Sequence, residues 1–228
     1  MGTKIQFKTA SGATAQGYLA QGPAGAPGVI VIQEWWGLVP QIEATCDRFA
    51  AAGFTALAPD LYDGRKVPND EPDEAAKQMM GLQFETAAAD LSGAVDELRE
   101  RTGHQRVGVV GYCMGGGLAL VLAARRADAV AAVVPCYGVH PWEQGHPDYT
   151  EMTAATQIHC ATRDQAFTPE AAEALAAKLS GLGKAVEVHL YEGADHAFGN
   201  ETRPEVYDPA ASQLMFDRTV SFLATHLA

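Results

Sequence analysis

Short apolar runs rich in β-branched residues alternate along this chain with longer stretches of helical periodicity. Residues 28–33 (GVIVIQ) and 54–59 (FTALAP) are almost continuously apolar, which is typical of strands that helices cover on both faces. Strands that alternate with helical stretches predict βαβ units, because two parallel strands need a long crossover between them. The alternation therefore predicts an α/β fold with a mostly parallel, doubly wound sheet flanked by helices.

The remaining elements can be placed along the chain without a linker, a repeat or a low-complexity tract. Further strands are expected at residues 4–9, 13–20, 106–111, 130–136, 157–162 and 186–191, the first two as an antiparallel edge pair. Helices are expected at residues 41–52, 74–101 with a break near Gly81, 114–127, 169–182 and 209–227. A chain of 228 residues lies below the roughly 250 to 300 residues at which one core usually splits. We therefore expect residues 1–228 to form a single domain.

The charge of the chain limits its partners. The formal net charge is -12 and the sequence pI is about 4.9, with acidic and basic residues mixed along the chain. Such a field repels phosphate backbones and anionic lipid surfaces, so neither a nucleic acid nor a membrane is expected as a partner. The first residues lack the apolar run of a secretory signal, and a cytoplasmic location is expected.

The four cysteines indicate neither a disulfide framework nor a metal site. Their wide spacing contains no CxxC pair and no Cys/His zinc pattern, so no metal is expected. Three of them are expected to be small buried hydrophobic residues, which is a common role of free cysteine: Cys46, Cys136 and Cys160. The fourth, Cys113, has a different setting.

Cys113 stands in the segment GYCMGGG, between an apolar strand (RVGVV) and an apolar helix (LALVLAA). This is the G-x-nucleophile-x-G elbow in the strand-turn-helix setting that the motif requires. The glycines do not follow GxGxxG and no GK[ST] follows, which argues against a dinucleotide or phosphate loop. The helix N-terminus favours a thiolate, so Cys113 is predicted to be a nucleophile rather than a buried structural cysteine.

A cysteine with the ordinary pKa of about 8.5 is only slightly ionised at neutral pH, so it needs a base and an orienting acid. In this architecture the three groups follow in the order nucleophile, acid, base. His196 lies in a loop beyond the last predicted strand, where the base belongs. Asp164 follows the preceding strand, whereas Asp195 adjoins His196 and would have difficulty turning back to its ring. We therefore favour Asp164 over Asp195 as the acid.

The oxyanion hole of such a site combines the N–H after the nucleophile with one from the loop after an early strand. These positions are Met114 and Trp35. Glu34 puts a carboxylate beside Trp35, at the carboxyl end of a buried strand. Because a nearby negative charge raises the pKa of a thiol, Glu34 is expected to hold Cys113 neutral until substrate enters. The alternative is a solvated loop glutamate.

Together these residues resemble the dienelactone hydrolase family over nearly the whole chain. The matching segments are VIVIQEWWGL, GYCMGG, the CYG after the next strand, the aspartate at Asp164, GADHAF and YDPAASQLMFDRTVSFLATHL. The resemblance implies the α/β-hydrolase fold, a triad of Cys113, His196 and Asp164, and Glu34 as the restraint on the thiol. It also implies a carboxymethylenebutenolidase-like enzyme without a cofactor, a monomer with a dimer as the alternative, that opens an enol lactone or activated ester through a thioester.

One departure from the family concerns substrate recognition. Members that degrade chloroaromatic compounds hold a substrate carboxylate with two arginines, one in the helical region after the Pro/Asp-rich loop and one shortly after the histidine. Here Asn200 occupies the second neighbourhood, and Lys77 is the only basic residue in residues 71–90. Arg65 and Arg203 are the candidates to replace the two arginines. Four loop aromatics are expected to line an apolar pocket: Trp36, Tyr137, Trp142 and Phe198.

Two functions from different classes remain open at this point. One is hydrolysis of a small-molecule lactone or ester, and the other is ligand binding by a catalytically inert protein that kept the fold. The intact triad favours the hydrolase.

Overall fold

The computed structural model describes residues 1–142 and 145–228, and the strands in these ranges form one eight-stranded sheet. The strands are β1 (Thr3–Lys8), β2 (Thr14–Ala20), β3 (Gly28–Ile32), β4 (Thr55–Pro59), β5 (Val107–Tyr112), β6 (Val130–Cys136), β7 (Ala155–Ala161) and β8 (Val186–Tyr191). Their order across the sheet is β1-β2-β4-β3-β5-β6-β7-β8. β2 is antiparallel to both of its neighbours, and the other pairs are parallel. The predicted α/β class and the antiparallel edge pair are confirmed.

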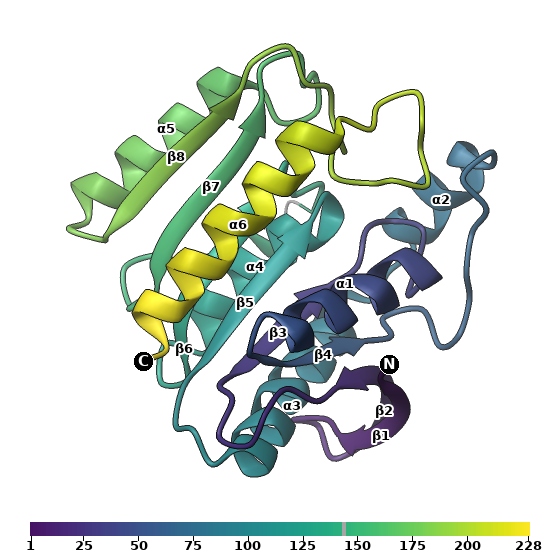
Figure 1. The fold of residues 1–228 in the computed structure, drawn as a ribbon, viewed down its shortest axis with the longest axis vertical. Coiled ribbons are helices and arrows are strands. Elements are labelled where there is room, and N and C mark those ends of the chain that lie inside the picture. Colours follow the sequence, from purple (N-terminus) through teal and green to yellow (C-terminus); the bar gives the residue numbers. More distant parts are fainter. Residues whose placement is uncertain (143–144) are drawn as a thin grey trace.

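Helices cover both faces of this sheet. They are α1 (Pro40–Ala51), α2 (Pro72–Met80), α3 (Phe84–Thr102), α4 (Met114–Arg125), α5 (Pro169–Gly181) and α6 (Pro209–His226). Figure 1 shows α1 and α6 over one face of the sheet and α3, α4 and α5 behind the other. Because helices cover both faces, β3, β4 and β5 are buried along their whole length. The predicted break near Gly81 is confirmed, since α2 ends at Met80 and α3 begins at Phe84.

The starts of four helices can be explained from single residues. Proline is the first residue of α1, α2, α5 and α6. Its fixed φ suits this position, and its missing N–H would have no partner there in any case. The carboxylate of Asp208 caps α6 by accepting hydrogen bonds from the N–H groups of Ala210 and Ala211, both at 3.0 Å. Such a cap satisfies N–H groups that have no partner inside the helix.

The sheet contains one topological switch point, between β3 and β5. The two strands are neighbours, but the chain runs from β3 outward to β4 and from β5 outward to β6. Loops that leave neighbouring parallel strands in opposite directions open a crevice at the carboxyl ends of those strands. Glu34 and Trp35 follow β3 and Cys113 follows β5, so the switch point brings these residues to one place.

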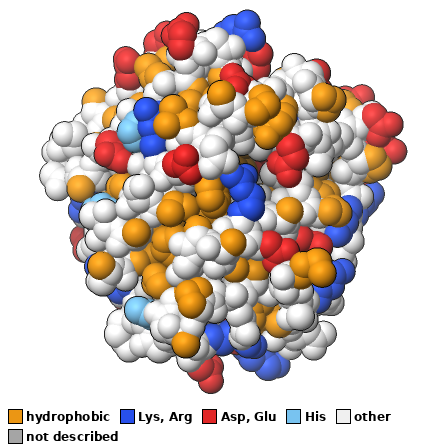
Figure 2. Space-filling view, in the orientation of Figure 1, with side chains coloured by type: hydrophobic (Ala, Val, Ile, Leu, Met, Phe, Trp, Pro, Cys, Tyr) orange, Lys and Arg blue, Asp and Glu red, His pale blue; other side chains and the backbone are white. Residues whose placement is uncertain are grey.

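The surface agrees with the mixed charge pattern of the sequence. Figure 2 shows acidic and basic side chains interspersed with apolar and neutral atoms on the face that α6 covers. In the two described ranges, no helix has the length and apolar character that crossing a membrane requires.

Candidate active site

Cys113 occupies a strained turn between β5 and α4. Its φ of 52° and ψ of -118° fall in a region that L-residues rarely adopt. The glycines around it permit the turn, because a Cβ on Gly111 would lie 1.9 Å from the carbonyl oxygen of Gly115. A Cβ on Gly115 would in turn lie 2.5 Å from the carbonyl oxygen of Ile32, so the start of α4 packs directly on β3. The steric role predicted for these glycines is confirmed.

His196 lies between Cys113 and Asp164. Its Nε2 is 3.2 Å from the sulfur of Cys113, and its Nδ1 is 2.7 Å from Oδ2 of Asp164. The Asp164 side chain is fully buried, and its Oδ1 accepts the N–H groups of Ala166 and Phe167 at 2.8 and 2.9 Å. With one oxygen fixed by the backbone, the other is held toward the imidazole. The structure therefore brings together the three residues that the sequence singled out.

The loops that carry the acid and the base are fastened to each other. The N–H of Gly193 donates to Oγ1 of Thr162 at 2.8 Å, and the N–H of Arg163 donates to the carbonyl of Ala194 at 3.0 Å. The competing acid, Asp195, forms an ion pair with Arg163 at 2.6 Å and lies 40% exposed. It is Asp164, rather than Asp195, that reaches the ring of His196.

The environment of His196 favours its protonated form. Burial by itself lowers the pKa of this imidazole, but the hydrogen bonds to Asp164 and Cys113 outweigh burial and raise the pKa to about 10. Tyr137 packs edge-on against the ring with centroids 5.4 Å apart, which limits the ring's motion. A proton on Nε2 is therefore available at neutral pH to a group bound beside the sulfur.

A cavity of about 400 Å³ opens at Cys113 and His196. Its walls are otherwise mainly apolar and come from the loops after β3 and β6, from α2 and from the acid loop: Trp35, Met79, Val139, His140, Pro141 and Ala166. Trp35 therefore lies where the sequence placed it. The sequence analysis did not identify the other wall residues, because none of them belongs to a recognisable motif. The available signal was position alone: Met79 lies at the end of α2, and Val139 lies in the loop after β6.

None of the four predicted aromatic residues lines this cavity. Trp36 contacts the ring of Trp35 edge-on, with centroids 5.1 Å apart, and is buried with Val67 and Ala75 of the segment around α2. Tyr137 and Phe198 are fully buried, with ring centroids 5.5 Å apart, so they support His196 from behind. Trp142 packs on Phe84 and His140 instead. The physical reason is shared: each of these rings fills a gap between the loops and the core, so none faces the substrate space.

The two candidate arginines also lie outside the cavity lining. Arg65 is more than half exposed and forms an ion pair with Glu74 of α2. Arg203 donates to Glu205 at 2.8 Å and lies over the ring of Trp36, 5.9 Å from its centroid. Each guanidinium is paired with a neighbouring carboxylate, and neither arginine lines the cavity.

Glu34 lies behind the site and is 1% exposed. Its Oε2 accepts a hydrogen bond from Nδ2 of Asn200 at 2.7 Å, and burial raises the pKa of this carboxyl, opposed by that bond and by the charges of His196 and Arg203. The sulfur of Cys113 contacts Nε2 of His196, and the carboxylate of Glu34 accepts a hydrogen bond from Asn200. Within the described ranges, no hydrogen bond joins Cys113 to Glu34. Asn200 binds one oxygen of the carboxylate, and the restraint of the thiol by the charge of Glu34 stays a prediction.

The N–H groups expected to form the oxyanion hole are both free of protein acceptors in the part of the chain that the structure describes. Met114 is the first residue of α4, so its N–H has no partner inside the helix. Trp35 follows β3 at the switch point, beside the cavity. Their role stays a prediction.

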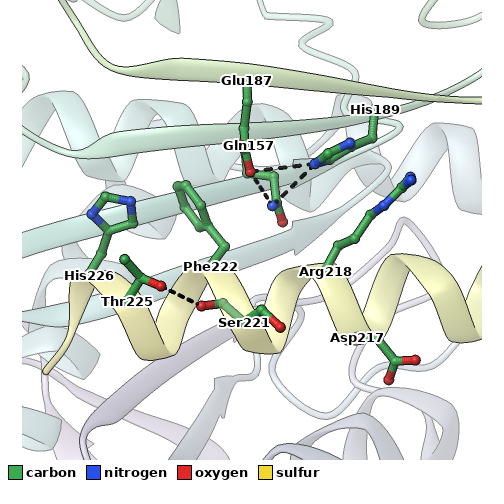
Figure 3. Close-up of a pocket in the computed structure, with 9 residues that line it drawn as sticks. All are labelled: Gln157, Glu187, His189, Asp217, Arg218, Ser221, Phe222, Thr225 and His226. Atoms are coloured by element: carbon green, nitrogen blue, oxygen red, sulfur yellow. Dashed lines mark hydrogen bonds and ion pairs between the residues drawn. The ribbon is translucent and has the colours of Figure 1, made fainter.

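A second, larger cavity of about 500 Å³ lies between β8 and α6 (Figure 3). Figure 3 shows Gln157, Glu187 and His189 hydrogen-bonded to one another on its floor, while Asp217 and Arg218 project from α6. Its nine lining residues include no cysteine and no base paired with a hydroxyl. Within residues 1–142 and 145–228, no group of three or more His, Cys, Asp or Glu side chains could hold a metal ion. The nucleophile and base point to the smaller cavity as the active site.

Comparison with known proteins gives a consistent result. The model of the dienelactone hydrolase family matches residues 15–227. The "Protein usf" of Aquifex pyrophilus is 36% identical over the full length of both chains. The carboxymethylenebutenolidase of Pseudomonas putida is 31% identical, covering 91% of this chain and 90% of the relative.

Solved structures agree in fold. A dienelactone hydrolase-like promiscuous phosphotriesterase from metagenomic libraries superimposes with a TM-score of 0.81 at 19% identity, covering 100% of this chain and 99% of the other. A dienelactone hydrolase from Anabaena variabilis gives a TM-score of 0.70 at 19% identity, with the same coverage.

Proposed function

This chain belongs to the dienelactone hydrolase family, and on that premise we propose that it is a cysteine-dependent hydrolase of enol lactones and activated esters. Hydrolysis of carboxylic esters or lactones agrees with relatives named carboxymethylenebutenolidase and, in a Bradyrhizobium species, a probable lactonase. One observation gives the strongest support to Cys113 as the nucleophile. His196 lies 2.7 Å from Asp164 and 3.2 Å from Cys113, at the mouth of a cavity of about 400 Å³.

The proposed reaction is acyl transfer in two steps. The sulfur of Cys113, its proton held by Nε2 of His196, attacks the carbonyl carbon, and the oxyanion is stabilised by the N–H groups of Met114 and Trp35. Collapse breaks the bond to the leaving oxygen, which takes the proton from Nε2, and a thioester on Cys113 results. Neutral His196 then removes a proton from water as it attacks the thioester; the new intermediate collapses, the C–S bond breaks, and the acid product leaves Cys113 as a thiolate beside the protonated His196. Asp164 keeps the ring in one orientation and stabilises its positive charge in both steps.

Sulfur as the nucleophile sets a preference among leaving groups. The tetrahedral intermediate expels either the thiolate, whose reference pKa is about 8.5, or the substrate oxygen. An alkoxide is far more basic than the thiolate, so attack on an alkyl ester reverses unless His196 protonates the oxygen in time. An enolate or phenolate leaves more readily. Enol lactones and aryl esters are therefore the substrates that suit this site.

The test compares a phenyl and an ethyl ester of the same acid with the wild-type protein and Cys113→Ala. We expect kcat/KM to favour the phenyl ester by at least 100-fold, about 2.7 kcal/mol, and Cys113→Ala to lose at least about 10⁴-fold in activity. A normal melting curve of the variant serves as the control for folding. Near-wild-type turnover by folded Cys113→Ala would remove the cysteine from the mechanism, and equal rates for the two esters would remove the leaving-group argument.

A further inference from the structure

We propose that this active site selects uncharged substrates and discriminates against esters or lactones that carry a carboxylate. The inference rests on the proposed function, because it concerns the same cavity. The observations behind it are the side chains of the cavity wall, the contacts of the triad, and the ion pairs of the cations on the segments that build the site.

The wall offers an anion no cationic side chain other than His196. Apart from the nucleophile and base, the described residues that line the cavity are Trp35, Met79, Val139, His140, Pro141 and Ala166. Burial and the neighbouring His146 lower the pKa of His140, so its ring is neutral at physiological pH. The two residues outside the described ranges are Glu143 and Gln144 by sequence, and neither is a base. A carboxylate in this cavity would therefore leave water without a compensating cation.

The triad offers a substrate anion no free cation. Its one base, His196, is engaged on both ring nitrogens. The imidazolium is engaged by Asp164 at 2.7 Å and by the sulfur at 3.2 Å. A substrate carboxylate thus meets a site whose one cation already has two partners, in a protein whose net charge is -12.

The cations on the surrounding segments are all occupied. Around α2, the Arg65 side chain is paired with Glu74, which also binds Lys77 at 3.6 Å. Lys66 lies 3.2 Å from Glu43 on α1. On the acid loop and on the loop after the base, the remaining pairs are Arg163 with Asp195 at 2.6 Å and Arg203 with Glu205 at 2.8 Å. Each of these cations therefore already has a carboxylate partner.

Two neighbouring methionines at the end of α2 provide a matched test. Met79 lines the cavity, whereas Met80 is 58% exposed and does not line it. A guanidinium introduced at position 79 adds a cation to the wall, and one at position 80 adds the same charge to the same helix outside the wall. Comparing the two variants separates a local anion contact from a change in net charge.

The experiment measures kcat/KM for 4-acetoxybenzoate and 4-acetoxybenzamide, two aryl acetates of similar shape that differ by one negative charge. Each value is divided by the hydroxide-catalysed rate constant of the same ester, which removes the difference in leaving group. We expect wild type to prefer the amide at least tenfold, corresponding to about 1.4 kcal/mol. Met79→Arg should reduce this preference at least fivefold, while Met80→Arg leaves it within twofold.

A second measurement does not depend on the variants. Benzamide should inhibit the wild-type protein more strongly than benzoate, because both fill the cavity but only benzoate is charged. Equal or better turnover of the carboxylated ester by wild type would overturn the proposal, and so would stronger inhibition by benzoate. An unchanged preference in folded Met79→Arg would also overturn it, since the missing cation would not be the cause. If neither ester is hydrolysed in a Cys113-dependent way, the proposed function fails instead.

Discussion

Replacing Asp164 with asparagine should disable the base while leaving the nucleophile in place. The aspartate is fully buried, with Oδ1 on two backbone N–H groups and Oδ2 on Nδ1 of His196 at 2.7 Å. An amide oxygen can keep the two backbone bonds, so its NH₂ group must face Nδ1. That nitrogen then becomes an acceptor, and the ring proton moves to Nε2, where it points at the sulfur of Cys113. In this tautomer His196 cannot take the proton of the thiol.

The size of the effect can be estimated from these contacts. General acid–base catalysis contributes about 10² to 10⁴ in rate, and the wrong tautomer costs about 10⁴ in a serine triad. Since the carboxylate here is buried and lies at 2.7 Å, we expect the upper part of this range. Asp164→Asn should lower kcat/KM by about 10³- to 10⁴-fold, about 4 to 5 kcal/mol. The second N–H of the amide has no acceptor, which should cost about 1 to 3 kcal/mol of stability.

The assay is hydrolysis of a phenyl ester at pH 7.5, with a melting curve for each variant. Asp195→Asn is the matched control, because it is the adjacent aspartate, lies 40% exposed and pairs with Arg163. Its activity should stay within threefold of wild type. The reasoning is refuted if folded Asp164→Asn retains a tenth of the activity, or if Asp195→Asn loses as much as Asp164→Asn does.

Two further predictions concern pH and Glu34. Since the pKa of His196 is raised to about 10, the imidazolium persists at lower pH and is lost only as the pH rises through about 10. In a stopped assay, kcat/KM for an alkyl ester should therefore fall above pH 10. A fall centred near pH 7 would contradict the assignment of His196 as the proton donor. Because Glu34 has no hydrogen bond to Cys113 in the described residues, it can restrain the thiol only through its charge; Glu34→Gln should then move the pH profile of iodoacetamide labelling of Cys113 to lower pH, and an identical profile would remove Glu34 from the mechanism.

The parts of the fold that the sequence predicts are those fixed by local chemistry. The break between α2 and α3 follows from Gly81, and the elbow follows from the glycines around Cys113, because only glycine fits such close backbone contacts. His196 and Asp164 could be chosen because the order of strands places their loops at one edge of the sheet. In each case one residue type and its position suffice for the inference.

The cavity wall could not be predicted in the same way. Trp35 and Trp36 are adjacent, with rings 5.1 Å apart, yet one lines the cavity and the other is buried beneath α2. Outside a regular strand, nothing in the sequence decides which of two neighbouring rings faces the substrate. The bond between Glu34 and Asn200 spans 166 positions of the chain, so it depends on how two distant loops meet. Such contacts follow from tertiary packing alone.

The catalytic residues and the cavity wall share some of their supporting contacts. Cys113 is held by the packing of α4 on β3, and His196 is held by Asp164 and the fastened loops after β7 and β8. The wall comes from α2, the loops after β3 and β6 and the acid loop, and the loop after β6 touches the elbow, where the N–H of Val139 donates to the carbonyl of Cys113 at 3.0 Å. Because Met79 lies on α2, apart from the residues that hold the elbow, the acid and the base, substitutions at Met79 can change which acyl or leaving group is accepted without moving the reacting atoms.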